Sequence, residues 1–280
     1  MIDLSQLPSL GDTIRQYDLW AKHKLGQHFL TDPVIMNRIA RAGAPLDAAS
    51  IIEIGPGPGG LTRALLQSGA QHLSVVEKDK RFLPPLSDIQ KLSTGKLSII
   101  EADALRLSLD QIAAPPYRII ANLPYNIATE LIVNWLIDED QIETMVVMVQ
   151  AEVAQRIIAP PNSAHYGRLA VLCAMVADCE IIFTLPPSAF TPPPKVNSAV
   201  IRISPHRGAK DLPLLKAVQR VSKAAFGQRR KMLRAALKTL DCDPKLLLDQ
   251  ADIDGTCRAE TLSLDDYIRL AKAYIAANQD

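Results

Sequence analysis

The sequence predicts an α/β protein in which a doubly wound sheet is followed by a smaller helical domain. Short apolar runs alternate with segments of helical periodicity, which is the pattern of a parallel sheet covered by helices. The expected strands lie near residues 51–54, 73–77, 97–101, 117–121 and 142–149. After about Ser204, the segment Pro205-His206-Arg207-Gly208 is typical of a linker, and the remainder has a helical pattern. We therefore expect one domain over residues 1–204 and a second over residues 205–280.

The sequence also predicts helices and strands outside these five strands. Residues 7–17 predict a short helix, and residues 130–137 predict a helix whose apolar side chains pack in the core. Strands near 174–184 and 197–203 are expected to form an antiparallel hairpin at the edge of the sheet. Because proline cannot continue a sheet ladder, residues 191–195 are expected to form an exposed rigid loop between them.

The composition narrows the class of protein. With 280 residues, 48% of them hydrophobic, the chain is long enough for one large core and a smaller one. No apolar run reaches about 18 residues and the first residues lack a signal-peptide pattern, so we expect no membrane span and a cytoplasmic location. The four cysteines have no C-x-x-C spacing and the five histidines form no i, i+4 pair. Neither a disulfide framework nor a metal site is therefore expected.

A glycine-rich loop follows the first expected strand. Gly55, Gly57 and Gly60 satisfy the dinucleotide-binding pattern G-x-G-x-x-G, and Glu77 lies about 20 residues further on, where a ribose-binding acid belongs. The pattern by itself also fits an NAD-dependent oxidoreductase. The two prolines within the loop and Glu53 just before it favour a different cofactor, and nothing like a hydride-transfer His or a Tyr-x-x-x-Lys motif supports NAD chemistry.

The tetrapeptide Asn122-Leu123-Pro124-Tyr125 follows the fourth expected strand, at the carboxyl end where open α/β sheets bind ligands. These residue types suit methylation of an exocyclic amine, because the Asn122 side-chain oxygen and the Leu123 carbonyl can accept both amine hydrogens. Pro124 fixes the backbone without donating a hydrogen bond, and Tyr125 offers a face on which a flipped base can stack. The alternative is a plain turn, since Asn and Pro are common turn residues.

Together, the glycine loop and the tetrapeptide resemble the S-adenosylmethionine site of class I methyltransferases, which have a Rossmann-like doubly wound sheet. The resemblance implies that Glu77 binds the ribose hydroxyls and that Asp103, after the third expected strand, meets the adenine amine. The alternative for both acids is a solvated carboxylate that caps the next helix.

The chain as a whole resembles the small-subunit (16S) rRNA adenine N6-dimethyltransferases of the KsgA or RsmA type. The resemblance covers residues 21–273, and its motifs are LGQHFL at 25–30, NLPYNIAT at 122–129, PPSAFTPPPKV at 186–196 and FGQRRK at 226–231. It implies an enzyme that transfers methyl groups from S-adenosylmethionine to N6 of two adjacent adenosines, in the hairpin loop near the 3′ end of 16S rRNA. The implied partner is the 30S particle or its precursor, the implied role is small-subunit biogenesis, and a monomer is expected.

The resemblance also implies roles for individual residues. The target adenine would stack between Tyr125 and Phe190, while Asn122 and Leu123 hold N6. The implied cofactor contacts are His28, Leu30, Gly55, Gly57, Glu77, Asp103 and Asn122. Three positions depart from the family pattern, because His28 stands where Asn is usual, Leu25 where Phe is usual, and Ala151 where many relatives have Lys. The histidine implies a possible pH dependence of cofactor affinity, and the alanine implies the loss of one RNA phosphate contact.

Basic residues gather after the linker, although the net charge is only +1. Residues 205–240 hold ten Lys or Arg and one acid, whereas residues 241–280 hold nine acids and four bases. Such clustering matters more than the total charge for nucleic-acid binding. The predicted RNA contacts, on one helical stretch, are Lys223, Arg229, Arg230, Lys231 and Arg234. The alternative is a solvated helix face.

Two other functions remain open from the sequence. The 23S rRNA adenine methylases that confer macrolide resistance share the glycine loop and an Asn-x-Pro-aromatic motif, although the prolines at 192–194 and residues 226–231 favour the 16S enzyme. A ribosome-assembly or transcription factor could keep the fold without catalysis, but the intact residues 122–125 argue against that loss.

Overall fold

The computed structural model describes residues 2–21 and 27–278. The chain divides into two compact units, the first formed by residues 1–154 and 180–205 and the second by residues 155–179 and 206–280. This division differs from the one expected at residue 205, because residues 155–179 belong to the second unit. The physical reason is packing, since buried side chains of this segment, Tyr166 and Val171 among them, join the hydrophobic core of the second unit.

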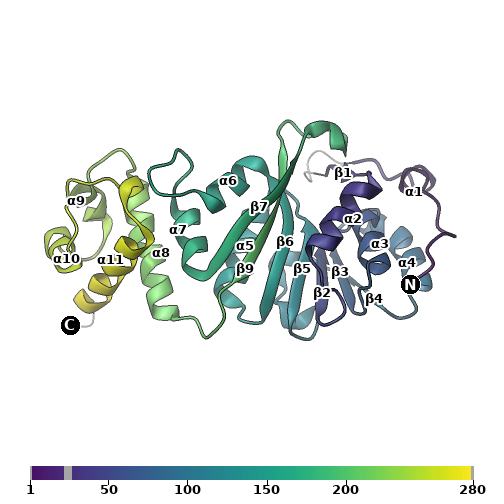
Figure 1. Ribbon diagram of the computed structural model, residues 1–280, viewed down its shortest axis with the longest axis horizontal. Helices are drawn as coiled ribbons and strands as arrows, with labels where there is room; N and C mark the ends of the chain where they lie inside the picture. The colour runs from purple at the N-terminus through teal and green to yellow at the C-terminus, as the bar shows by residue number, and fades with distance from the viewer. Residues whose placement is uncertain (1, 22–26, 279–280) are drawn as a thin grey trace. The chain divides into compact units, whose positions relative to one another are not determined.

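The first unit is built on a seven-stranded sheet with the order β4-β3-β2-β5-β6-β9-β7 (Figure 1). The strands are β2 (Ser50–Ile54), β3 (Leu73–Glu77), β4 (Leu97–Glu101), β5 (Tyr117–Asn122), β6 (Ile142–Gln150), β7 (Ala177–Leu185) and β9 (Ser198–Pro205). Strands β2 to β6 pair in parallel with their neighbours, and β9 pairs antiparallel with β6. The chain starts in the middle of the sheet, winds outward to β4 and returns to β5, which confirms the predicted doubly wound arrangement.

A second, two-stranded sheet joins segments that are far apart in the sequence. Strand β1 (Phe29–Leu30) pairs antiparallel with β8 (Phe190–Thr191), with Leu30 opposite Phe190. The sequence did not predict this pairing, and it placed residue 191 in a loop. Both strands are only two residues long, so neither carries a periodic pattern that could predict a strand.

Helices cover both faces of the large sheet. The first unit contains α1 (Leu10–Gln16), α2 (Pro33–Ala42), α3 (Gly60–Gln67), α4 (Leu83–Leu92) and α5 (Ala128–Asp138), and α6 (Ala151–Ile158) runs on from it. Helix α2 begins where the Asp32 side chain accepts a hydrogen bond from the Val34 backbone N–H, with Pro33 as the first helical residue. In Figure 1, α2 and α3 lie in front of the sheet and α5 lies behind it.

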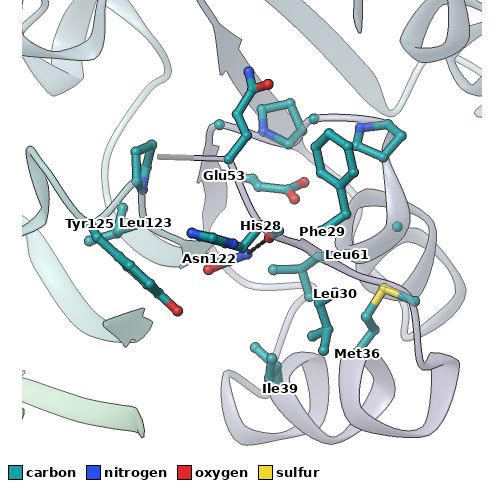
Figure 2. Close-up of a pocket in the computed structure, with 17 residues that line it drawn as sticks. His28, Phe29, Leu30, Met36, Ile39, Glu53, Leu61, Asn122, Leu123 and Tyr125 are labelled. Carbon is teal, nitrogen blue, oxygen red and sulfur yellow. Dashed lines mark hydrogen bonds between the residues drawn. The ribbon is translucent and has the colours of Figure 1, made fainter. Parts of the chain in front are cut away.

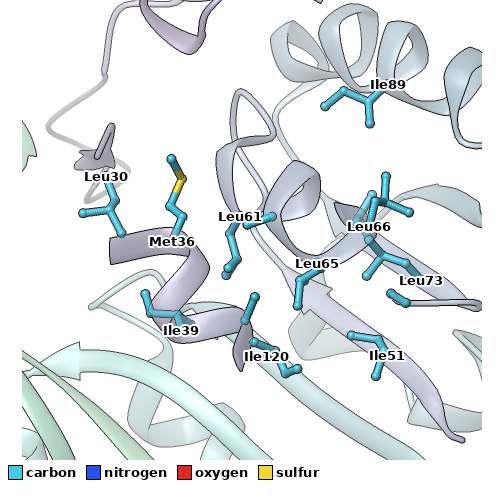
Figure 3. Close-up of a cluster of buried hydrophobic side chains, with 14 of the residues drawn as sticks. Leu30, Met36, Ile39, Ile51, Leu61, Leu65, Leu66, Leu73, Ile89 and Ile120 are labelled. Atoms are coloured by element: carbon cyan, nitrogen blue, oxygen red, sulfur yellow. The ribbon is translucent and has the colours of Figure 1, made fainter. Parts of the chain in front are cut away.

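The core of the first unit lies between the sheet and helices α2, α3 and α4. Figure 3 shows Met36 and Ile39 of α2 and Leu65 of α3 above strand residues such as Ile51 and Ile120. Ile39, Ile51, Leu65 and Ile120 are completely buried. Successive strand residues point to opposite faces of the sheet. The side chains that face the helices are buried in this core, so the residues at the strand ends remain available for a site.

The second unit is helical, as the sequence predicted for residues after the linker. Its helices are α7 (Arg168–Val176), α8 (Leu212–Gly227), α9 (Leu233–Ala236), α10 (Pro244–Ala251) and α11 (Leu264–Ala277). Two predictions about this region were wrong. Residues 174–176, expected in a strand, form the end of α7, and the expected helical stretch across residues 223–238 is broken after α8. The break is stabilised by Met232, which bridges to Arg258, and by the Leu233 backbone N–H, which donates to the Cys257 carbonyl.

The helices described in the two units are all too short or too polar to cross a membrane.

Candidate active site

Four strands of the first unit end at one edge of the sheet, and the segments that follow them line two adjoining cavities. The first cavity is lined by residues of the glycine loop, by residues 27–30 and by residues 122–125 (Figure 2). The second is lined by residues that follow β3 and β4 and by Asn126 and Ile127. Gln27, Gly55 and Pro124 line both, so the two cavities meet beside the tetrapeptide.

The glycine loop approaches the tetrapeptide closely because it lacks side chains. Gly55 and Gly57 have φ values of 66° and 53°, in the left-handed region that glycine enters readily. A Cβ atom added at Gly55 would lie 3.4 Å from Cγ of Pro124. The loop therefore leaves an open backbone surface where the two cavities meet.

Glu77 ties the glycine loop to the segment after β3. Its Oε2 accepts a hydrogen bond from the Gly57 backbone N–H at 3.1 Å, and its Oε1 accepts one from the Asp79 N–H at 2.8 Å. Burial raises the pKa of the Glu77 carboxyl. An ionised carboxylate can accept about four hydrogen bonds, so both oxygens keep acceptor capacity toward the second cavity, which Glu77 lines.

Asp103 caps the next helix, which was one of the two roles considered from the sequence, and its contact with the adenine amine stays a prediction. It caps a short 3₁₀ helix (Ala104–Arg106), because its Oδ1 accepts a hydrogen bond from the Leu105 backbone N–H at 3.2 Å. Its Oδ2 pairs with Lys78 Nζ at 2.7 Å, and this hydrogen bond lowers the pKa of the Asp103 carboxyl. Asp103 also lines the second cavity, as Glu77 does.

The tetrapeptide stands where β5 ends. The Asn122 Nδ2 lies 3.5 Å from the His28 carbonyl oxygen, which orients the amide and leaves Oδ1 as its acceptor (Figure 2). The Leu123 backbone N–H donates to the Met148 carbonyl of β6 at 3.1 Å, and the side chain is buried. Within the described ranges, no hydrogen bond reaches the Leu123 carbonyl. Asn122 and Leu123 both line the first cavity, so Asn122 Oδ1 and Leu123 O are two acceptors available there.

Two contacts hold the Tyr125 side chain, one at its hydroxyl and one at its ring. Its hydroxyl lies 2.5 Å from the Ser198 Oγ of β9. Its ring stacks on the His28 imidazole, with ring centroids 5.8 Å apart and an interplanar angle of 28°. The imidazole is fixed in turn by a contact of 2.8 Å between its Nδ1 and the Pro192 carbonyl. Sequence reasoning missed Ser198, which no motif marked.

The structure buries Phe190, the residue that the resemblance implied as the second stacking wall beside Tyr125. Phe190 is 3% exposed and belongs to the hydrophobic core of the first unit. The pairing of β8 with β1 places it opposite Leu30, which is 7% exposed. The His28 ring lies beside Tyr125, and the stacking role of Phe190 stays a prediction.

Glu53 is a buried acid without a basic partner among the described residues. It is 2% exposed, and its Oε2 accepts a hydrogen bond from the Thr62 hydroxyl at 2.6 Å. Burial raises the pKa of the Glu53 carboxyl to about 8, and the nearby Glu77 adds to the shift. The carboxyl lines the first cavity (Figure 2), so a cationic ligand there would stabilise its ionised form.

A polar network joins Gln27 to the end of β3, and apart from the LGQHFL motif no sequence pattern predicted it. Gln27 Nε2 donates to Asp79 Oδ2 at 3.2 Å, and Arg81 donates to both residues, at 2.6 Å to Asp79 Oδ2 and 3.2 Å to Gln27 Oε1. The hydrogen bond from Arg81 is the main reason why the pKa of Asp79 falls to about 2. Leu25, the other unusual position of this motif, lies outside the described residues.

The predicted RNA-binding residues do not share one helix. Lys223 lies on α8, Arg229 to Lys231 lie in the turn after it, and Arg234 lies on α9. All except Arg229 are exposed. Arg229 is half-buried, and its Nε pairs with Glu260 Oε2 at 2.7 Å while Nη2 donates to the Ser163 carbonyl at 3.3 Å. Arg229 is therefore engaged in the structure of the second unit itself.

The cavities fit S-adenosylmethionine. The second cavity offers the carboxylates of Glu77 and Asp103, which suit hydroxyl and amine donors. The first offers apolar side chains, Leu30 and Met36 among them, beside the Glu53 carboxyl, which suits a sulfonium group. In the described part of the chain, no group of three or more His, Cys, Asp or Glu side chains could hold a metal ion.

Comparisons with known proteins identify relatives over nearly the whole chain. The family model described as ribosomal RNA adenine dimethylase matches residues 19–276. The chain is 50% identical to ribosomal RNA small subunit methyltransferase A of Gluconobacter oxydans, over 97% of this chain and 89% of that protein. It is 47% identical to the protein of the same name from Agrobacterium fabrum, over 97% and 99% of the two chains.

Solved structures give the same fold. The 23S rRNA methyltransferase ErmE is 26% identical, with a TM-score of 0.65 over 88% of this chain and 99% of that one. A dimethyladenosine transferase from Plasmodium falciparum is 23% identical, with a TM-score of 0.73 over 87% and 96% of the two chains, and it supports the fold. The chain thus belongs to the ribosomal RNA adenine dimethylase family, and its methyl donor is S-adenosylmethionine.

Proposed function

We propose that the enzyme dimethylates N6 of two adjacent adenosines in the hairpin loop near the 3′ end of 16S rRNA, within the 30S particle or its precursor. It would act as a monomer in the cytoplasm, as a step of small-subunit biogenesis. The observation that carries the proposal is the position of residues 122–125, with two acceptors and one aromatic face where the two cavities meet. The relatives named ribosomal RNA small subunit methyltransferase A support the 16S substrate.

The chemistry depends on how the chain treats the exocyclic amine of adenine. S-adenosylmethionine, when bound, supplies an electrophilic methyl group. Asn122 Oδ1 and the Leu123 carbonyl accept the two N6 hydrogens, which directs the nitrogen lone pair away from the ring. The nitrogen becomes strongly acidic once it has been alkylated, so its proton leaves without a strong base. Catalysis is then mainly orientation and electrostatics.

The adenosine part of the cofactor is assigned to the second cavity. Glu77 would accept the ribose hydroxyls, and Asp103 would accept the adenine amine. Gly55, Gly57 and Leu30 would line the remainder, since they border the first cavity. Asn122 lines the first cavity and would contact both the cofactor and the target base.

RNA contacts are proposed for the basic residues of the second unit. Lys223, Arg230, Lys231 and Arg234 have exposed side chains that can reach phosphates. Arg229 is the weakest member of the predicted set, because an RNA phosphate would have to compete with Glu260 for it.

The test is incorporation of labelled methyl groups from S-adenosylmethionine into 30S particles that lack this modification, with the nucleoside identified by mass. We expect N6,N6-dimethyladenosine at two adjacent positions of 16S rRNA. Isolated 23S rRNA is the second substrate in the same assay, because ErmE shares the fold. Methylation of 23S rRNA with none in 30S particles would refute the proposed substrate.

A further inference from the structure

We propose that Ser198 is a positioning residue for methyl transfer, which holds the Tyr125 ring in the orientation on which the target base stacks. The inference rests on the proposed function, because it assumes that a base stacks on Tyr125. Ser198 lies outside the motifs that carry the family resemblance, and it is not among the residues that line the two cavities. Its Oγ lies 2.5 Å from the Tyr125 hydroxyl, and through this contact it acts on the site.

The sheet holds Ser198 in place. Ser198 is the first residue of β9 and is completely buried. It lies opposite Gln150 in the antiparallel pairing of β9 with β6, and next to it the Ala151 backbone N–H donates to the Asn197 carbonyl at 2.9 Å. Only one torsion angle places the oxygen of a serine side chain, and that angle has few allowed values. The Ser198 Oγ is therefore a fixed anchor point.

Tyr125 lies in a loop, where its ring needs such an anchor. The loop follows β5 and ends where α5 begins at Ala128. The Tyr125 side chain is partly exposed, so packing in the core does not fix its two torsion angles. The hydroxyl is the atom farthest from the backbone, so a hydrogen bond there restricts both angles at once. The contact is at the edge of the ring, so Ser198 does not cover the faces on which a base can stack.

The contact also ties the tetrapeptide to a second strand. In the sheet, β6 lies between β5 and β9. The Leu123 backbone N–H donates to the Met148 carbonyl of β6 at 3.1 Å, and Tyr125 reaches beyond β6 to Ser198 of β9. The proposed amine acceptors, Asn122 and Leu123, and the proposed stacking face are therefore held in one frame. Loss of the Ser198 contact would release the stacking face and leave the acceptors in place.

Both hydroxyls are needed for the contact. Burial raises the pKa of the Tyr125 hydroxyl, so it keeps its proton at neutral pH, and either hydroxyl can donate to the other. Removing one hydroxyl takes this partner away from the other, whereas removing both leaves two apolar groups. The two single removals should therefore have similar effects on the reaction, and the double removal should add nothing to them.

The test is a double-mutant cycle of Ser198→Ala and Tyr125→Phe in the full chain, with unmodified 30S particles. Rates are expressed per cofactor-binding site, counted by calorimetric titration with S-adenosylmethionine, so that unfolded protein does not contribute. The base leaves its loop after the particle has bound, so the cost of ordering a released ring falls on kcat, which should drop about 2- to 13-fold in each single variant. The KM for 30S particles and the cofactor Kd should change by less than about twofold, and the double variant should be no slower than the slower single variant.

Thr144→Val is the matched control, because it removes another buried hydroxyl that joins β6 to β9. Thr144 Oγ1 donates to the Ile203 carbonyl at 3.5 Å, and Thr144 lines neither cavity. This variant should keep the kcat of the wild type.

Three results would overturn the assignment. Ser198→Ala could keep the kcat of the wild type, the two single effects could multiply in the double variant, or Thr144→Val could be as slow as Ser198→Ala. All ratios to the wild type are measured on whichever of the 30S and 23S rRNA substrates the wild type methylates. A wild type that is active only on 23S rRNA thus refutes the proposed substrate, while the ratios on that RNA decide the role of Ser198.

Discussion

Replacing Glu53 with Gln should flatten the pH dependence of the stability of the first unit. The Glu53 carboxyl is 2% exposed, and its pKa is raised from 4.5 to about 8, mainly by burial. Below the lower value, the carboxyl is protonated in the folded and the unfolded chain. Between the two values, only the unfolded chain releases the proton, so the free energy of unfolding falls as pH rises. Above pH 8 the loss is complete.

The magnitude follows from the size of the shift. At about 1.4 kcal/mol for each pKa unit, a shift from 4.5 to about 8 corresponds to about 5 kcal/mol in total. Between pH 5 and pH 8, the wild-type carboxyl should lower the free energy of unfolding by about 3 kcal/mol. Gln has no proton to exchange, and its side-chain carbonyl can still accept the hydrogen bond from the Thr62 hydroxyl.

The assay is urea unfolding of cofactor-free protein at pH 5 and pH 8, followed by tryptophan fluorescence. The two tryptophans of the chain, Trp20 and Trp135, both belong to the first unit, so the signal reports that unit. From pH 5 to pH 8, the free energy of unfolding of Glu53→Gln should rise by about 3 kcal/mol relative to that of the wild type. Glu101→Gln, which changes a more exposed carboxyl on β4, is the matched control. Equal pH dependence in the wild type and Glu53→Gln would refute the reasoning.

Three further predictions concern the reaction and its RNA. Asn122→Ala should lower kcat on the order of 100-fold in the 30S methylation assay with little change in cofactor Kd, and near wild-type turnover would remove Asn122 from the mechanism. Glu77→Ala should raise the calorimetric Kd for S-adenosylmethionine by about 10- to 150-fold, because hydrogen bonds to a charged group are lost; unchanged affinity would reject the ribose contact. Arg230→Ala with Arg234→Ala should weaken 30S binding and make the slope of log affinity against log salt shallower by about 0.7 to 0.9 for each lost contact. Arg229→Ala, which breaks the pair with Glu260, is the control and should leave that slope unchanged.

The sheet and the motifs at its edge could be predicted because their signals are local. Strands β2 to β6 carry continuous apolar runs, and the glycine loop lies directly between β2 and α3. Asn122 ends β5 and residues 123–125 follow it, so the carboxyl-edge rule predicted a ligand site there. Family resemblance then supplied the chemistry that these positions carry.

The features that were missed depend on contacts between distant segments. The burial of Phe190 follows from the pairing of β8 with β1, which no periodicity in either segment encodes. The membership of residues 155–179 in the second unit follows from packing against its helices. The pairing of Arg229 with Glu260 joins residues 31 positions apart, so a count of charges could not distinguish it from an exposed base.

The pairing of β1 with β8 has a consequence for the order in which contacts can form while the chain is being synthesised. The hydrogen bond that holds the His28 imidazole reaches Pro192, which follows it by 164 positions. During synthesis, the segments that form β2 to β6 all emerge before residue 190 does. A nascent chain can therefore assemble its parallel strands while the pocket beside Tyr125 still lacks an anchored His28. The contacts that hold the Tyr125 and His28 rings can be complete only after synthesis has passed residue 198, when Ser198 and Pro192 are both present.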